Sequence, residues 1–225
     1  MLFDRLLRNS ALVYTNPQSR MRFGYVLAFM VVFPALIWIL VDKHPFGGDQ
    51  SQYGSDSVRL FYTLVFSPSD WPQLLLNVVL NRGPGIAWIG QFFVPLAHVV
   101  GSIDDALLFA VLMAQTLSLV LIYRSVFDLA SRKISIASLA TIVMGAAPLF
   151  VVYFRNYMIE PFQILAVTWL VLIMSLAPKW NRGLLFSQLL AASLFAVVIR
   201  ATTLIYCLGP GIIAMVFVGW PKTAD

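Results

Sequence analysis

The sequence predicts an all-α membrane protein that crosses the bilayer about six times, and three observations lead to this fold class. Of the 225 residues, 60% are hydrophobic and only 11% are charged, whereas about 25% of a typical soluble domain is charged. The mean hydropathy is +0.85, so too few polar side chains remain to cover a soluble globule. Long apolar runs recur along the whole chain, which excludes a disordered chain and differs from the short alternating segments of a membrane β-barrel.

Six uncharged runs are long enough to be transmembrane helices, since about 20 residues rising 1.5 Å each cross the hydrocarbon core. They are residues 23–41, 106–123, 134–154, 161–178, 183–199 and 201–221. Residues 1–22 precede the first run, and residues 42–105 form the longest segment outside the six. We therefore expect residues 1–225 to form one membrane module, with five of its spans in residues 106–221.

A seventh run, residues 83–103, holds two prolines and four glycines, and the basic residues decide whether it also crosses. With six spans and a cytoplasmic N-terminus, 10 of the 15 Lys and Arg residues lie on the inner side and 5 on the outer side. With seven spans, the better orientation gives only 9 against 6. Because Lys and Arg favour the cytoplasmic side, we expect six spans, with residues 83–103 as a re-entrant or surface helix.

The large outer loop, residues 42–105, contains two apolar pieces of about ten residues, too short to span. Residues 58–66 and 71–80 are separated by Ser67, Pro68 and Ser69, and we expect both pieces to be amphipathic helices lying in the membrane interface. Aromatic side chains suit that depth, and the loop offers Tyr53, Tyr62, Trp71 and Trp88. We expect Ser102, with the two aspartates that follow, to cap the next span.

Acidic residues gather on the predicted outer side. Seven of the ten lie there: Asp42, Asp49, Asp56, Asp70, Asp104, Asp105 and Glu160. Acidic residues contribute little to topology, so this asymmetry indicates a different role. We expect the chemistry of the protein to lie on this face.

Histidine, cysteine and net charge indicate no further class of site. Cys207 is the single cysteine, which excludes an intrachain disulfide and a thiolate zinc site. His44 and His98 lie in no metal-binding motif, so we expect no metal site, although a need for a divalent cation stays open. The net charge of +5 comes from basic residues at the ends of apolar runs, a pattern of membrane orientation rather than nucleic-acid binding.

Three segments carry polar motifs in order along the chain. The first is an outward aspartate after span one, in the pattern Asp49-x-x-x-Tyr53, followed by Arg82-Gly83-Pro84-Gly85. The second is residues 150–162, FVVYFRNYMIEPF, which contains Glu160, and the third is residues 196–205, AVVIRATTLI, which contains Arg200. Together the three segments resemble the N-terminal module of the GT-C membrane glycosyltransferases, in the group of the protein O-mannosyltransferases and aminoarabinose transferases. In this resemblance residues 82–85 match the family's R-P-P-L element, Glu160 its second acidic position and Arg200 its basic position.

The resemblance implies a sugar donor carried on a polyprenyl phosphate and a lipid or glycan acceptor. Transfer would be inverting, to an acceptor hydroxyl on the outer face of the plasma (inner) membrane. Family members run to several hundred residues, so we expect this chain to be a truncated form or to work with a partner subunit. Two other classes stay open: a non-catalytic subunit or scaffold, and a lipid-linked-sugar transporter. Transporters place ionisable residues in mid-span, and this chain places them at the span ends.

The same resemblance assigns roles to residues. Asp49 and Glu160 are the candidate catalytic carboxylates, because an acceptor hydroxyl needs a base to take its proton. The candidate substrate-binding residues are Tyr53, Arg82, Arg155 and Arg200, since a leaving phosphate needs cations, best Arg.

Four of the six candidates also have a purely structural interpretation. Asp49 suits a turn after two glycines, and Glu160 suits a helix N-terminus before Pro161. Arg155 suits a side chain that snorkels to the interface, and Arg82 suits a solvated surface.

Overall fold

The computed structural model describes residues 17–43, 45–78 and 83–205, and confirms the all-α fold class. The described residues form helices and no strands. The elements are α2 (Pro17–Val41), α3 (Gly48–Phe66), α4 (Trp71–Asn77), α5 (Gly85–Gly90), η1 (Val94–Leu96), α6 (Ala97–Val100), α7 (Ile103–Leu129), α8 (Ile134–Gly145), α9 (Pro148–Val152), η2 (Tyr153–Arg155), α10 (Glu160–Leu176), η3 (Ala177–Lys179) and α11 (Arg182–Ile199).

Four helices of the described part are long and apolar enough to cross a membrane: α2, α7, α10 with its η3 extension, and α11. A fifth span is formed if α8 and the α9–η2 segment are taken together, since they pass the same test as a pair bent by 57°. The bend lies just before Pro148, which has no N–H to continue the ladder of α8. These five match the first five predicted spans. The sixth, residues 201–221, lies almost wholly outside the described residues.

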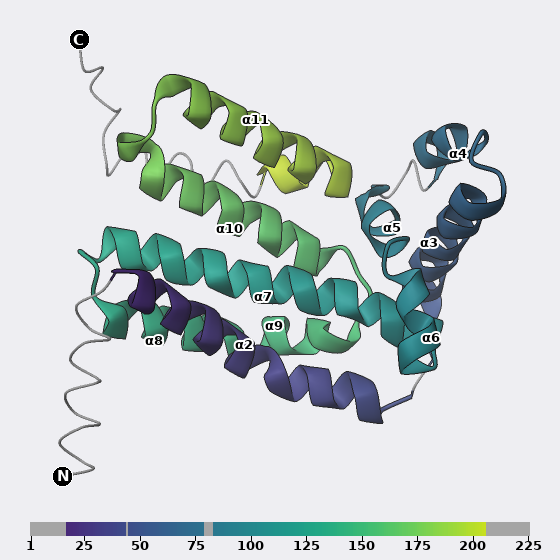
Figure 1. The fold of residues 1–225 in the computed structure, drawn as a ribbon, viewed down its shortest axis with the longest axis horizontal. Helices are drawn as coiled ribbons and strands as arrows, with labels where there is room; N and C mark the ends of the chain where they lie inside the picture. The colour runs from purple at the N-terminus through teal and green to yellow at the C-terminus, as the bar shows by residue number, and fades with distance from the viewer. Residues whose placement is uncertain (1–16, 44, 79–82, 206–225) are drawn as a thin grey trace.

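Helix α7 is the centre of the bundle and packs against α2, α8 and α10, while α10 packs against α11 (Figure 1). Small residues such as Ala28 on α2 and Ala110 and Ala114 on α7 are fully buried, which allows close helix packing inside a membrane. Many large apolar side chains of α2, α8 and α11 are exposed, as lipid-facing helices require.

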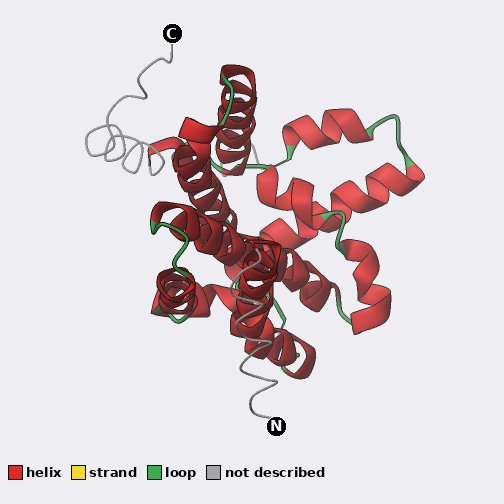
Figure 2. Ribbon diagram, turned by 60° about the vertical axis from the view of Figure 1, so that its left-hand side comes forward, coloured by secondary structure: helices red, strands yellow, loops and turns green. Residues whose placement is uncertain are grey.

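Helices α3 to α6 do not join the bundle, and they gather at one end of it (Figures 1 and 2). Near this end α2 finishes and α7 begins: Lys43 Nζ lies 2.6 Å from Asp105 Oδ2, and the N–H of Phe46 donates to Asp104 Oδ2 at 2.8 Å. The start of α10 and the end of α11 lie here as well (Figure 1). We call this the α3 end of the bundle.

The doubtful run, residues 83–103, is divided into α5, η1 and α6, each of six residues or fewer. No described helix in it is long enough to cross, in agreement with the six-span interpretation. The two short helices predicted for the outer loop are confirmed only in part. The predicted helix 58–66 is the second half of α3, which begins at Gly48 and has 19 residues, and the predicted helix 71–80 ends as α4 at Asn77. Residues 48–57 are mostly polar, so the apolar pattern did not indicate the first half of α3. Ser102 caps α7 as predicted, accepting from the N–H of Asp105 at 3.5 Å.

Candidate functional site

Four of the six predicted site residues line one hollow at the α3 end. The hollow has a volume of about 180 Å³ and is lined by Asp49, Tyr53, Met158, Ile159, Glu160 and Arg200. These residues come from the first turns of α3, the segment that opens α10, and the C-terminal cap of α11. Residues more than 100 positions apart in the sequence thus share one concave surface.

Helix α3 contributes Asp49 and Tyr53, which are one helical turn apart and therefore lie on the same side. The helix begins at Gly48, whose φ of +53° favours glycine. Asp49 is consequently part of the first helical turn rather than of a preceding turn. An acidic side chain is a common and favourable residue in the first turn of a helix, because it interacts with the partial positive charge of the N-terminus. Asp49 is exposed, whereas Tyr53 is buried.

Glu160 is the first residue of α10, directly before Pro161. No side chain makes a capping hydrogen bond at this helix start. Of the predicted capping role, only the favourable interaction of the carboxylate with the helix dipole remains. The Oε2 atom of Glu160 is buried and has no hydrogen-bond partner among the described residues. A buried carboxylate oxygen normally has a partner, and the described residues supply none for this oxygen.

Arg200 is the C-cap residue of α11 and is exposed. Its position is fixed from two sides. The turn that follows is tied to α10, because Gln163 Nε2 donates to Thr203 Oγ1 at 3.0 Å. The backbone of Gly83 packs so closely on the end of α11 that a Cβ atom there would lie 1.9 Å from the carbonyl oxygen of Ile199.

This packing brings part of the predicted R-P-P-L-like element next to Arg200. Gly83 has a φ of +91°, and a Cβ on Gly85 would meet the Ile199 side chain at 2.7 Å. The glycines therefore occupy places where a side chain does not fit. Arg82 itself lies outside the described residues.

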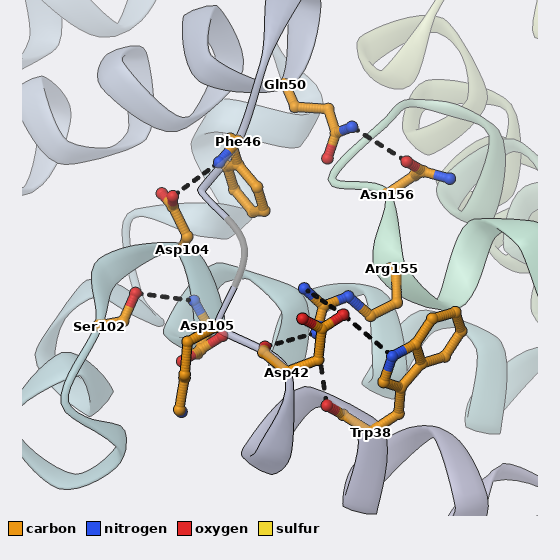
Figure 3. A network of polar contacts seen from close by, with 10 residues as sticks. Trp38, Asp42, Phe46, Gln50, Ser102, Asp104, Asp105, Arg155 and Asn156 are labelled. Carbon is orange, nitrogen blue, oxygen red and sulfur yellow. Dashed lines mark hydrogen bonds and ion pairs between the residues drawn. The ribbon is translucent and has the colours of Figure 1, made fainter.

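Gln50 and Tyr157, which the sequence interpretation did not single out, hold the segment before Glu160 against α3. The side-chain amide of Gln50 donates to Asn156 Oδ1 at 3.0 Å (Figure 3). The side-chain oxygen of Gln50 accepts from the N–H of Tyr157 at 3.1 Å. Gln50 is adjacent to Asp49 in the sequence, and Tyr157 lies three residues before Glu160. These contacts therefore hold the backbone next to Asp49 against the segment that leads to Glu160.

Tyr157 is the most constrained of these residues. It is fully buried, its hydroxyl lies 2.9 Å from Ser57 Oγ and donates to the carbonyl oxygen of Ile86 at 2.8 Å, and its ring stacks on Phe46. Burial raises the pKa of the Tyr157 hydroxyl well above its usual range, so the group stays a protonated donor. The only indication of Tyr157 in the sequence was its position within the predicted motif, residues 150–162.

Arg155 does not line the hollow. Its Nη1 donates to the carbonyl oxygen of Asp42 at 2.7 Å, its Nη2 lies 3.3 Å from Asp42 Oδ2, and its guanidinium lies 5.5 Å from the centre of the Trp38 ring (Figure 3). It ties the end of η2 to the end of α2. A role for Arg155 in substrate binding stays a prediction, and the contacts seen are with the protein.

The hollow thus combines two carboxylates, a phenol and a guanidinium. The described residues contain no group of three or more His, Cys, Asp or Glu side chains that would hold a metal ion. A carboxylate beside a helix N-terminus can accept a proton, and a guanidinium can bind an anion with two parallel hydrogen bonds.

Comparison with known proteins gives no further guide to these residues. The chain matches no protein-family model, and no curated protein or solved structure is significantly similar to it.

Proposed function

We propose that the chain is a glycosyltransferase module that transfers a sugar from a polyprenyl-phosphate donor to an acceptor hydroxyl, with inversion at the anomeric carbon. The observation that supports this most is that Asp49, Glu160 and Arg200 line one hollow at the end of a bundle of membrane-length helices. A lipid-linked donor cannot leave the bilayer, so its phosphate would be met at this depth.

In this proposal Asp49 takes the proton of the acceptor hydroxyl as the new glycosidic bond forms. Asp49 is exposed in the first turn of α3, so an incoming acceptor can reach it. Arg200 binds the donor phosphate and stabilises the negative charge that develops as the sugar leaves. Glu160, with its unpartnered oxygen, accepts a hydrogen bond from a sugar hydroxyl or shares the work of the base.

The proposal also includes the orientation of the chain in the membrane. The α3 end faces the outer side of the plasma (inner) membrane and the N-terminus is cytoplasmic. This places the acidic residues of the α3 end on the outer face, with the basic residues Arg132, Lys133 and Arg182 at the opposite end.

The test is a transfer assay on the purified full chain, with a radiolabelled polyprenyl-phosphate hexose or pentose and a lipid acceptor extract. Donor binding is measured in parallel by equilibrium filtration. Asp49→Asn removes basicity and keeps the shape and hydrogen bonds of the side chain, so we expect normal donor binding and a rate about 100-fold or more below that of the unmodified chain. Asp70→Asn, the same change at an exposed position in the α3–α4 turn, is the control and should be neutral.

The results separate the open classes. Donor binding without transfer in the unmodified chain supports one of the two non-enzymatic classes, a non-catalytic subunit or a lipid-linked-sugar transporter. An unmodified chain that neither binds the donor nor transfers the sugar would overturn the proposal. Normal turnover by Asp49→Asn shows that Asp49 is not the base.

A further inference from the structure

A second hollow lies beside α3, separate from the candidate glycosyltransferase site. Its volume is about 390 Å³, and its walls are a different face of α3 and the start of α7. Apolar side chains come from Phe46, Val58 and Ile103, and polar ones include Ser55, Arg59 and Asp104. None of the residues that line the first hollow also lines this one.

The depth of this second hollow follows from α7. That helix has 27 residues, from Ile103 to Leu129, and at 1.5 Å per residue it is about 40 Å long, against about 30 Å for the hydrocarbon core. Its ends therefore extend into the headgroup layers. Ile103 and Asp104 are its first two residues, so the hollow lies at the level of lipid headgroups. Val99, just before them, is 82% exposed and offers an apolar surface to acyl chains.

The hollow presents one positive and one negative side chain whose hydrogen-bonding groups are not all paired with the protein. Arg59 is exposed and makes no hydrogen bond or short ion pair with the described residues, although the Asp56 carboxylate, a turn earlier on α3, is close enough to interact with its charge. Asp104 accepts from the N–H of Phe46 through Oδ2, and its Oδ1 has no partner in the described part of the chain. The neighbouring Asp105 is neutralised by Lys43 at 2.6 Å.

We propose that this hollow binds the headgroup of a zwitterionic phospholipid with a primary ammonium, the phosphatidylethanolamine class. The phosphate lies at Arg59 and the Ser55 hydroxyl, the ammonium donates to Asp104, and the first acyl carbons contact Phe46, Val58 and Ile103. A zwitterion meets an opposite charge at both walls. An anionic headgroup such as phosphatidylglycerol meets Asp104 unfavourably, and a quaternary ammonium has no N–H to donate to the carboxylate.

The test uses the full chain, purified and delipidated in detergent. Phosphatidylethanolamine, phosphatidylcholine and phosphatidylglycerol with the same acyl chains are added in turn, and lipid retained by the protein is counted by native mass spectrometry. We expect retention in that order. Arg59→Gln should weaken retention of both zwitterionic lipids about tenfold, the effect of losing one charged hydrogen-bond partner at a partly open site. Arg59→Lys, which keeps the charge, should recover most of it.

Asp104→Asn isolates the ammonium contact, because the amide oxygen still accepts from Phe46. We expect it to remove the preference for phosphatidylethanolamine over phosphatidylcholine and leave phosphatidylglycerol no longer disfavoured. The matched controls are Arg182→Gln at the opposite end and Asp70→Asn, both of which should change nothing. All variants alter exposed or half-buried side chains, and thermal unfolding in detergent checks their folding.

Equal retention of phosphatidylglycerol and phosphatidylethanolamine by the unmodified chain would overturn the proposal. So would an Asp104→Asn protein with an unchanged ratio between the two zwitterionic lipids. Because no sugar donor or transfer is involved, the result is independent of the proposed function.

Discussion

At the scale of single residues, Arg200 tests the proposed donor site most directly. A planar guanidinium binds phosphate with two hydrogen bonds, whereas an ammonium offers only a point charge. We expect Arg200→Ala to raise the KM for the lipid-linked donor by roughly 30-fold or more and Arg200→Lys to be milder. If Arg200 binds the leaving phosphate more tightly as charge develops, kcat falls as well. Steady-state transfer against donor concentration measures both constants.

Arg155→Ala is the contrasting variant. Arg155 makes its contacts with Asp42 and Trp38, so its loss should lower the melting temperature and leave the donor KM close to normal. An Arg200→Ala protein with unchanged kinetics would show that Arg200 only anchors the end of α11.

Gly90 and Tyr157 provide a second test at the residue scale. A Cβ on Gly90 would lie 1.8 Å from the Tyr157 hydroxyl and 2.6 Å from Ser57 Oγ, so Gly90→Ala should cost about 1–3 kcal/mol of stability through overpacking. Tyr157→Phe should itself cost about 1–3 kcal/mol, because the Ile86 carbonyl loses its donor. In the double variant the clashing oxygen is gone, so its loss of stability should be smaller than the sum of the losses in the two single variants. Thermal unfolding of the four proteins measures this coupling, and strict additivity would contradict the packing described.

At the scale of elements, the contact between residues 83–85 and the end of α11 determines how the outer helices meet the bundle. Gly83→Ala forces an alanine into a left-handed φ of +91°, and its Cβ clashes with the backbone oxygen of Ile199. A backbone oxygen cannot rotate away as a side chain does. We expect a loss of about 2 kcal/mol or more in unfolding free energy, together with weaker donor binding, since the contact is next to Arg200.

Gly47→Ala is the matched control for that variant. Gly47 lies at the same end, its φ of −120° is open to any residue, and a Cβ there would meet nothing within 4 Å. Because Gly47 is the N-cap of α3, where alanine is less favourable than glycine, we expect a loss of stability well below that of Gly83→Ala and unchanged donor binding. Equal effects of the two substitutions would mean that the 83–85 segment does not pack on α11.

At the scale of the whole molecule, Ser55 and Lys133 lie at opposite ends of the bundle, because the membrane-length helix α7 separates them in the chain. We expect Ser55→Cys, in a Cys207→Ser background, to react with an impermeant maleimide from outside intact cells. Lys133→Cys should react only after permeabilisation. The reason is the 10-to-5 distribution of basic residues in the six-span topology. Labelling of position 133 alone from outside would invert the orientation and place the proposed site on the cytoplasmic face.

The sequence by itself determined the helices and the end at which the polar residues meet. Runs of about 20 uncharged residues have no soluble alternative, and alternating crossings require Asp49, Glu160 and Arg200 to lie at one end if 83–103 does not cross. Only the tertiary structure decided which of these residues share a hollow. Arg155 has the same kind of sequence context as Arg200, yet it pairs with Asp42 because η2 ends beside α2, while the end of α11 lies beside α3 and α10. Hydropathy is a property of one segment at a time, whereas the rotation of each helix and the fit of Gly90 against Tyr157 depend on side chains far apart in the chain.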